Sequence, residues 1–174
     1  MPMLYNVVQQ ILQFGAVTSR DVLYDIGWGD GAVANAAARG GTRAGAYPLC
    51  PLGYVVATRN ARNAGVVRTM TVGTDFYAAD LRDATVVVLH MLPTLNQKLL
   101  SKLTKELTPG ARIISVVFNM GDCYPPDRTL RLDGSPPLFA TLNSWTMPMK
   151  SKCEPAAVVE HARPISSRSV RSRP

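Results

Sequence analysis

The sequence predicts a mixed α/β fold built on one sheet. Short apolar runs rich in β-branched residues alternate with amphipathic stretches, which is typical of parallel strands joined by helices. A glycine-rich stretch, residues 25–31, lies between the first apolar run and the next helical stretch. The last two apolar runs have no helical stretch between them, which indicates an antiparallel hairpin. We therefore expect a Rossmann-like, seven-stranded, mostly parallel sheet with helices on both faces and an antiparallel edge hairpin.

The first elements are two helices and two strands. Residues 3–14 carry apolar side chains at helical spacing and predict an amphipathic helix. Residues 21–27 form an apolar run that ends in glycine, which predicts a buried strand. The alanine-rich residues 30–41 predict a helix that ends at two glycines, and residues 42–47 predict a second short strand.

The middle of the chain continues the alternation. Residues 52–65 predict a helix that ends at a glycine, and residues 66–73 predict the third strand. Residues 84–92 are continuously apolar and β-branched, as expected for a central parallel strand covered on both faces. Residues 94–107 place leucines on one helical face and lysines on the other.

The last elements are three strands. Residues 111–118 predict a fifth buried strand. Two shorter strand-like pieces follow at residues 128–133 and 137–145, separated by Gly-Ser-Pro-Pro. Because no helix separates these two pieces, we expect them to form the edge hairpin.

The chain divides by composition into a domain and a tail. At 174 residues with 47% apolar residues, it suits a single domain, which we expect over residues 1–149. Residues 150–174 hold six basic residues against two acidic ones and are rich in Ser, Arg and Pro, so we expect a disordered tail. The tail either solubilises the protein or contacts nucleic acid or an acidic partner.

Composition also bears on the cellular location. No apolar run reaches the roughly 18 residues of a membrane span, and the N-terminus lacks the pattern of a secretory signal. Cys50, Cys123 and Cys153 form neither a zinc pattern nor an even disulfide set, which fits a reducing compartment. We therefore expect a cytoplasmic protein.

The stretch "YDIGWGDGAVA", residues 24–34, is the strongest candidate for a binding site. Glycine allows a sharp turn and a close approach of a ligand to the backbone, although a strand–helix turn without a ligand is also compatible with the motif. A dinucleotide fingerprint is satisfied loosely by Gly27, Gly29 and Ala32. The carboxylate of Asp25 would crowd a pyrophosphate, whereas it suits the amine and sulfonium groups of S-adenosylmethionine. The charge therefore favours S-adenosylmethionine over NAD.

This loop resembles the first motif, D-x-G-x-G-x-G, of the class I, seven-β-strand S-adenosylmethionine-dependent methyltransferases. The match consists of Asp25, Gly27, Gly29 and Gly31. Further stretches resemble the small bacterial relatives of the mitochondrial protein-lysine methyltransferases: "ARNAGV", "ADLRDATVVVLHMLPTLNQKL", "LTPGARIISVVFNMGDCYPPDRTLRL" and the Trp145–Pro148 segment. The resemblance covers roughly residues 5–148. It implies methyl transfer from S-adenosylmethionine to a protein lysine.

The resemblance also implies roles for individual residues. The loop would hold the amino-acid part of the cofactor, Asp75 would bind the adenine amino group and Phe76 would lie beside the ring. The methyl-transfer site would lie at the end of the fourth strand, which makes His90 and Asn96 the catalytic candidates, without a metal. The cofactor-binding candidates are Asp25, Gly27, Trp28, Gly29, Asp30, Gly31, Tyr47, Asp75, Phe76 and His90.

The chain departs from the family pattern at several places. The family has an acidic residue at the end of the second strand for the ribose hydroxyls, and here Tyr47 lies near that position, with no Asp or Glu between Asp30 and Asp75. Losing such a charged hydrogen bond costs about 1.5–3 kcal/mol. After the fifth strand, "SVVFNMGDC" replaces several polar or aromatic residues of the subgroup. Two alternatives therefore stay open: a methyltransferase-like binding module without catalysis, and an NAD(P)-binding oxidoreductase.

Overall fold

The computed structural model describes residues 5–27, 29–66, 69–71, 75–132 and 141–152. The helices are α1 (Tyr5–Phe14), α2 (Ala32–Arg39), α3 (Pro51–Asn63) and α4 (Pro93–Glu106). The strands are β1 (Val22–Gly27), β2 (Arg43–Pro48), β3 (Thr69–Thr71), β4 (Val86–His90), β5 (Arg112–Val116), β6 (Arg128–Arg131) and β7 (Thr141–Thr146). The predicted tail, apart from residues 150–152, lies outside the described residues.

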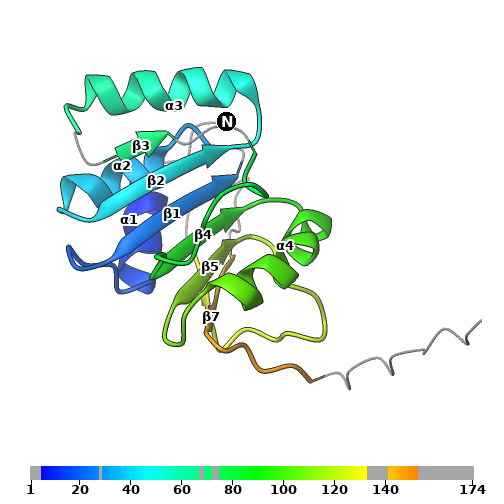
Figure 1. The fold of residues 1–174 in the computed structure, drawn as a ribbon. Coiled ribbons are helices and arrows are strands. Elements are labelled where there is room, and N and C mark those ends of the chain that lie inside the picture. Colours follow the sequence, from blue (N-terminus) through cyan, green and yellow to red (C-terminus); the bar gives the residue numbers. More distant parts are fainter. Residues whose placement is uncertain (1–4, 28, 67–68, 72–74, 133–140, 153–174) are drawn as a thin grey trace, which may run out of the picture.

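The strands form one sheet in the order β3-β2-β1-β4-β5-β7-β6 (Figure 1). All pairs from β3 to β5 are parallel, whereas β7 runs antiparallel to both β5 and β6. This arrangement confirms the predicted mostly parallel α/β sheet with an antiparallel hairpin at one edge. Each predicted helix and strand is present, with ends that shift by a few residues.

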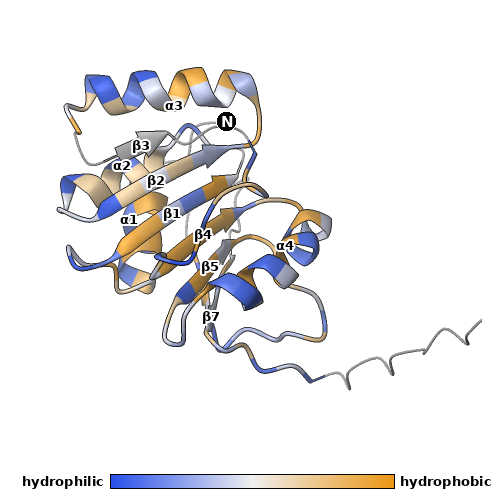
Figure 2. Cartoon of the chain, in the orientation of Figure 1, coloured by the Kyte–Doolittle hydropathy of each residue, from blue (hydrophilic) through white to orange (hydrophobic). Residues whose placement is uncertain are grey.

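Helices cover both faces of the sheet, as predicted. On one face, α1 and α2 pack on the sheet through small and β-branched side chains, and α3 packs beside α2 and β2. On the other face, α4 packs through its leucines, together with the segment that precedes β4. The central strand β4 is buried from Val86 to Leu89, which confirms the interpretation of its continuous apolar run. Figure 2 shows this contrast between the hydrophobic central strands and the hydrophilic outer residues of α4.

The cysteines differ from the sequence-based expectation. Cys123 is disulfide-bonded, whereas Cys50 is a free thiol at the N-terminus of α3. Spacing along the chain does not report distance in space, so it could not predict this bond. None of the helices in the described part of the chain is long and apolar enough to cross a membrane.

A polar cluster ties three strands together at their N-terminal ends. The Asp21 carboxylate accepts a hydrogen bond from the Thr85 hydroxyl (2.7 Å) and pairs with the Arg112 guanidinium. Arg112 also donates to the carbonyl oxygens of Gly15 (2.6 Å) and Ala16 (2.9 Å), which follow α1. Burial alone would raise the pKa of Asp21, but the hydrogen bonds from Thr85 and Thr18 and the Arg112 charge outweigh burial and hold the pKa below 3.8.

We expect Asp21→Asn to lower the free energy of unfolding at pH 7 by about 1.5–3 kcal/mol, because hydrogen bonds to a charged group contribute about that much. Since the folded-state pKa is depressed, the stabilisation is present above pH 3.8 and is lost as the pH falls further. Urea unfolding measures the difference. Asp80→Asn is the matched control, since Asp80 pairs with Arg82 at an exposed surface. Equal effects of the two substitutions would contradict the role of the cluster.

Candidate functional site

The candidate site lies at the C-terminal ends of the central strands. Gly27, the last residue of β1, is aligned with Pro48 at the end of β2 and with His90 at the end of β4. From β1 the chain continues to β2 and β3 on one side of β1, and then crosses to β4 and β5 on the other side. The strand order therefore reverses between β1 and β4, where Gly27 and His90 lie. Open α/β sheets bind ligands at this point, beyond the carboxyl ends of the strands.

Asp25 contributes a buried carboxylate to the site. Its side chain is only 8% exposed, and its Oδ2 accepts a hydrogen bond from the backbone N–H of Ala34 in α2 at 3.3 Å. Burial raises the pKa of Asp25 to about 6, and the nearby Asp30 charge adds to the shift while the backbone hydrogen bonds from α2 oppose it. A positively charged group beside Asp25 would favour the ionised carboxylate and offset the cost of its burial.

Gly27 and Gly31 of the loop lie so close to neighbouring elements that a side chain does not fit at either position. A Cβ on Gly27 would lie 2.5 Å from the carbonyl oxygen of His90, a distance that no side chain tolerates. Gly31, the N-cap residue of α2, has a φ of 76°, and a Cβ there would lie 3.1 Å from the Cβ of Ala57 in α3. Gly27 therefore lets β1 and β4 approach closely, and Gly31 lets α3 approach the loop.

A narrow cleft, without room for a water molecule in this structure, lies between the loop and β2. It is lined by Asp25, Gly27, Gly29, Gly31, Ala46 and Pro48. Tyr47 was the expected neighbour of the cofactor, but its side chain lies on the other face of the sheet, 4% exposed, with its ring 5.5 Å from that of Tyr24. Side chains alternate along a strand, so an offset of one residue changes the face. Pro48, which the apolar pattern of the sequence does not single out, lines the cleft instead.

His90 and Asn96 lie close to the end of β4 but differ in access. His90 is partly exposed, and burial lowers its pKa below the ordinary 6.5, which keeps the imidazole neutral at pH 7. Asn96 is fully buried, and its Nδ2 donates to the Ser115 hydroxyl (3.1 Å) and to the Asn119 carbonyl oxygen (3.3 Å). Asn96 therefore ties α4 to the end of β5 and has no surface to offer a substrate.

The remaining candidates lie around the loop and after β3. Asp30 caps the first turn of α2 by accepting from the backbone N–H of Ala32 at 3.2 Å. Asp75 is exposed and uses its Oδ1 to accept from the backbone N–H of Tyr77 at 2.9 Å. Phe76 is buried in the core beside α4, with its ring 4.3 Å from the Tyr77 ring. Trp28 lies outside the described residues.

The chemistry of the site fits S-adenosylmethionine better than a dinucleotide. The cleft is lined by a buried carboxylate and by glycines whose backbone is not covered by side chains. This combination suits the positively charged amino group of an amino acid. A pyrophosphate would meet the negative charge of Asp25 instead. Among the described residues, no cluster of three or more His, Cys, Asp or Glu side chains could hold a metal ion. The fold and this site define a class I methyltransferase.

Comparisons with known proteins identify the family. The family model of the ANTKMT methyltransferase domain matches residues 25–127. A protein-lysine N-methyltransferase of Saccharolobus islandicus (strain REY15A) is 32% identical over 133 residues, which cover 75% of this chain and 83% of the relative. The chain belongs to this family of S-adenosylmethionine-dependent methyltransferases, and S-adenosylmethionine is its cofactor. These matches do not favour the oxidoreductase or the non-catalytic alternative.

Solved structures agree with the fold. An RNA methyltransferase from Salinibacter ruber in complex with S-adenosyl-L-homocysteine superposes with a TM-score of 0.77 at 36% identity, over 90% of this chain and 97% of that one. TrmN from Thermus thermophilus superposes with a TM-score of 0.66 over 83% of this chain and 48% of that one. At 13% identity, TrmN supports the fold alone.

We expect Asp25→Asn to raise the free energy of unfolding of the ligand-free protein by up to about 3 kcal/mol at pH 7.5, since each pKa unit corresponds to about 1.4 kcal/mol. The folded protein holds this proton more tightly than the unfolded chain does. The wild-type protein therefore loses stability as the pH rises from 3.8 to about 6, whereas the Asn variant does not.

Urea unfolding of both proteins at pH 4 and pH 7.5 measures this difference. The advantage of Asp25→Asn is expected to be small at pH 4 and complete at pH 7.5. Asp122→Asn, which removes an exposed carboxylate after β5, is the matched control and is expected to change little. A variant that is less stable than the wild type at pH 7.5 would contradict the cost assigned to the buried charge.

Proposed function

We propose that this methyltransferase transfers the methyl group to a protein lysine, and that Asp25 and the glycine loop bind the amino-acid end of the cofactor. The buried Asp25 carboxylate, which lines the same cleft as Gly27, supports the proposal for the cofactor end because its negative charge suits a cationic ligand. The name of the Saccharolobus islandicus relative supports lysine as the acceptor. When bound, S-adenosylmethionine supplies a methyl group on a positively charged sulfur.

His90 is the proposed base of the acceptor site. A lysine side chain attacks only as the neutral amine, and its ordinary pKa of about 10.4 keeps it protonated at neutral pH. His90 ends β4 next to Gly27, is partly exposed and is neutral at pH 7, so it can accept that proton. Asn96 acts in this proposal as a positioning residue, because its buried amide fixes the first turn of α4 against β5.

The exposed side chains near these strand ends suit the aliphatic part of a lysine. Leu92, at the N-terminus of α4, is 52% exposed, and Val117, directly after β5, is 37% exposed. Tyr77, after β3, is 47% exposed. Val117 has a φ of 74°, which β-branched residues rarely adopt, and such strain is a frequent feature of functional sites. Exposed apolar side chains and a neutral base are compatible with a methylene chain that ends in an amine.

RNA is the second candidate acceptor. The Salinibacter ruber structure that matches 90% of this chain is named an RNA methyltransferase. The net charge of +7 and the basic residues 150–174 would favour contact with phosphate. In this proposal, residues 1–149 form the catalytic domain, and the tail contacts either the acidic surface of a protein substrate or a nucleic acid.

We expect the purified protein to transfer labelled methyl groups from S-adenosylmethionine into proteins of a cell lysate. The label is expected to survive nuclease, to be removed by protease and to be recovered as methyl-lysine after acid hydrolysis. Asp25→Asn is the matched inactive control, because it is expected to fold stably while losing the charge that binds the cofactor. Label that nuclease removes would replace lysine by RNA as the acceptor.

A second substitution series tests where the cofactor ribose lies. We expect Pro48→Glu to tighten binding of S-adenosylhomocysteine by about 10- to 100-fold, because it returns a carboxylate to the cleft and such a hydrogen bond contributes about 1.5–3 kcal/mol. Tyr47→Glu is the matched control and is expected to lower stability without tightening binding, since position 47 faces the core. Calorimetric titration measures both. If Tyr47→Glu tightened binding and Pro48→Glu did not, the ribose would lie beside position 47 and the proposed placement at Pro48 would be wrong.

A further inference from the structure

The outer face of α3 exposes apolar side chains and arginines in one line. Leu52, Val55, Arg59 and Arg62 are spaced by three, four and three residues, so they follow one another along the helix over about 15 Å. Leu52 is 72% exposed and Val55 is 61% exposed, and both arginines are exposed. The buried alanines of α3 lie on the opposite side of the helix, against β2 and β3 (Figure 1). These four outer residues form the α3 stripe, with its apolar part toward the N-terminus of the helix.

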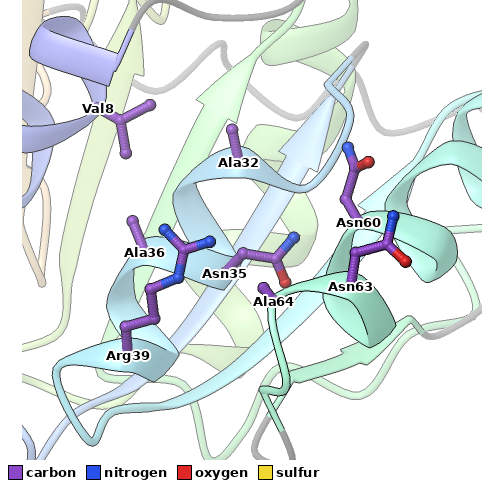
Figure 3. A pocket seen from close by; sticks show the side chains of 8 residues that line it. All are labelled: Val8, Ala32, Asn35, Ala36, Arg39, Asn60, Asn63 and Ala64. Atoms are coloured by element: carbon purple, nitrogen blue, oxygen red, sulfur yellow. The ribbon is translucent and has the colours of Figure 1, made fainter.

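The surroundings of the α3 stripe are positively charged. Residues 31–74 contain five arginines and no Asp, Glu or Lys. On the side toward α2, two asparagines of α3 and Arg39 of α2 line a hollow in which none of the lining residues is acidic (Figure 3). Asp30, whose carbonyl oxygen is bonded to α3, uses its carboxylate to cap α2. The ion pairs that the described residues form do not include Arg59 or Arg62, so the charge of the stripe suits an acidic partner.

The apolar end of the α3 stripe lies next to the cofactor cleft. A Cβ on Gly53, which follows Leu52, would lie 3.0 Å from the Cβ of Pro48 and 3.5 Å from the carbonyl oxygen of Gly29, and both of these residues line the cleft. The exposed large apolar side chains of the described residues are Leu52, Tyr54, Val55, Tyr77, Leu92, Val117 and Leu130. All but Leu130 belong to segments that follow the parallel strands β2, β3, β4 and β5. The stripe therefore begins at the same edge of the sheet as the proposed acceptor site.

A protein partner fits these features better than the other candidates do. A single exposed apolar residue is common, but a line that joins Leu52 and Val55 to two arginines suits a protein segment in which apolar residues precede carboxylates. A second copy of α3 would bring further arginines and no carboxylate. A nucleic acid would engage the arginines through its phosphates and leave the apolar half of the stripe without a partner. A membrane surface requires an apolar face along the length of the helix, whereas the second half of this stripe is charged.

We propose that the α3 stripe is a docking surface for the protein substrate, and that the substrate carries an acidic amphipathic segment apart from its lysine. Apolar residues of that segment pack on Leu52 and Val55, near the cofactor cleft. Its carboxylates pair with Arg59 and Arg62, about two to three turns further along α3. This inference rests on the proposed transfer to a protein lysine, and it places part of the recognition of the substrate outside the acceptor site.

Two synthetic helical peptides without lysine are the probes. The acidic peptide has leucines in its first turns and glutamates on the same face of its last turns, and the basic peptide has arginine in place of each glutamate. Fluorescence anisotropy measures their binding to protein saturated with S-adenosylhomocysteine. We expect the wild type to bind the acidic peptide at least about tenfold more tightly than the basic one. Arg59→Glu/Arg62→Glu is expected to reverse this preference, a result that a misfolded variant would not give.

Arg20→Glu/Arg131→Glu is the matched control, because it makes the same change in net charge at exposed positions before β1 and in β6. It is expected to keep the preference of the wild type. Leu52→Ser/Val55→Ser is expected to weaken the acidic peptide at least about tenfold, while leaving S-adenosylhomocysteine binding unchanged. An unchanged preference in Arg59→Glu/Arg62→Glu, or an equal loss of preference in the control, would overturn the proposal.

Inhibition of methyl transfer tests whether the docked partner is the substrate. The acidic peptide, supplied well above its Kd, is expected to lower label transfer into lysate proteins about tenfold by competition, whereas the basic peptide is expected to leave it unchanged. Undiminished transfer, or label that nuclease removes, would overturn the assignment of the α3 stripe to a protein substrate. A lack of any transfer would instead contradict the proposed function. The reversal of peptide preference needs no methyl transfer, so it decides the docking surface separately.

Discussion

The burial of the Asp25 carboxylate at the end of β1 is the constraint on which the rest of the site depends. Its oxygen accepts from the first turn of α2, so the charge fixes where the helix begins relative to the strand. Burial that raises its pKa to about 6 makes this arrangement unfavourable in the ligand-free protein. In the proposed function, a cationic ligand beside Asp25 would offset this cost of burial.

Two close approaches, at Gly27 and Gly31, lie around the same cleft as Asp25. With Gly27 against the His90 carbonyl, the end of β4 lies beside the end of β1, and the partly exposed imidazole is held near the loop. With Gly31 against Ala57, α3 lies against the loop. The loop thus sets the position of the neighbouring elements, and small residues are required at each contact because backbone lies within van der Waals distance.

The sequence was sufficient for the fold and only partly for the site. Apolar periodicity located the helices and strands, since it reports directly on which face of an element is buried. It could not assign the face of Tyr47, because a shift of one residue along β2 exchanges the core for the cleft and leaves the apolar pattern almost unchanged. Nor could it find the cluster of Asp21, Thr85 and Arg112, whose members are more than 60 residues from Asp21 along the chain.

The carboxylates of Asp21, directly before β1, and Asp25, within β1, have opposite effects on stability. The Asp21 carboxylate is surrounded by donors and a guanidinium, so its ionised form stabilises the fold and its pKa falls. The Asp25 carboxylate has only backbone donors and is near another acid, so its ionised form destabilises the fold and its pKa rises. Above pH 3.8, the ionised Asp21 stabilises the folded protein. Over the same range, ionisation of Asp25 lowers the free energy of unfolding. If Asp25 served folding alone, we would expect a basic partner beside it, as Arg112 lies beside Asp21. Among the described residues, no basic side chain is paired with Asp25, and this leaves its charge available to a cationic ligand.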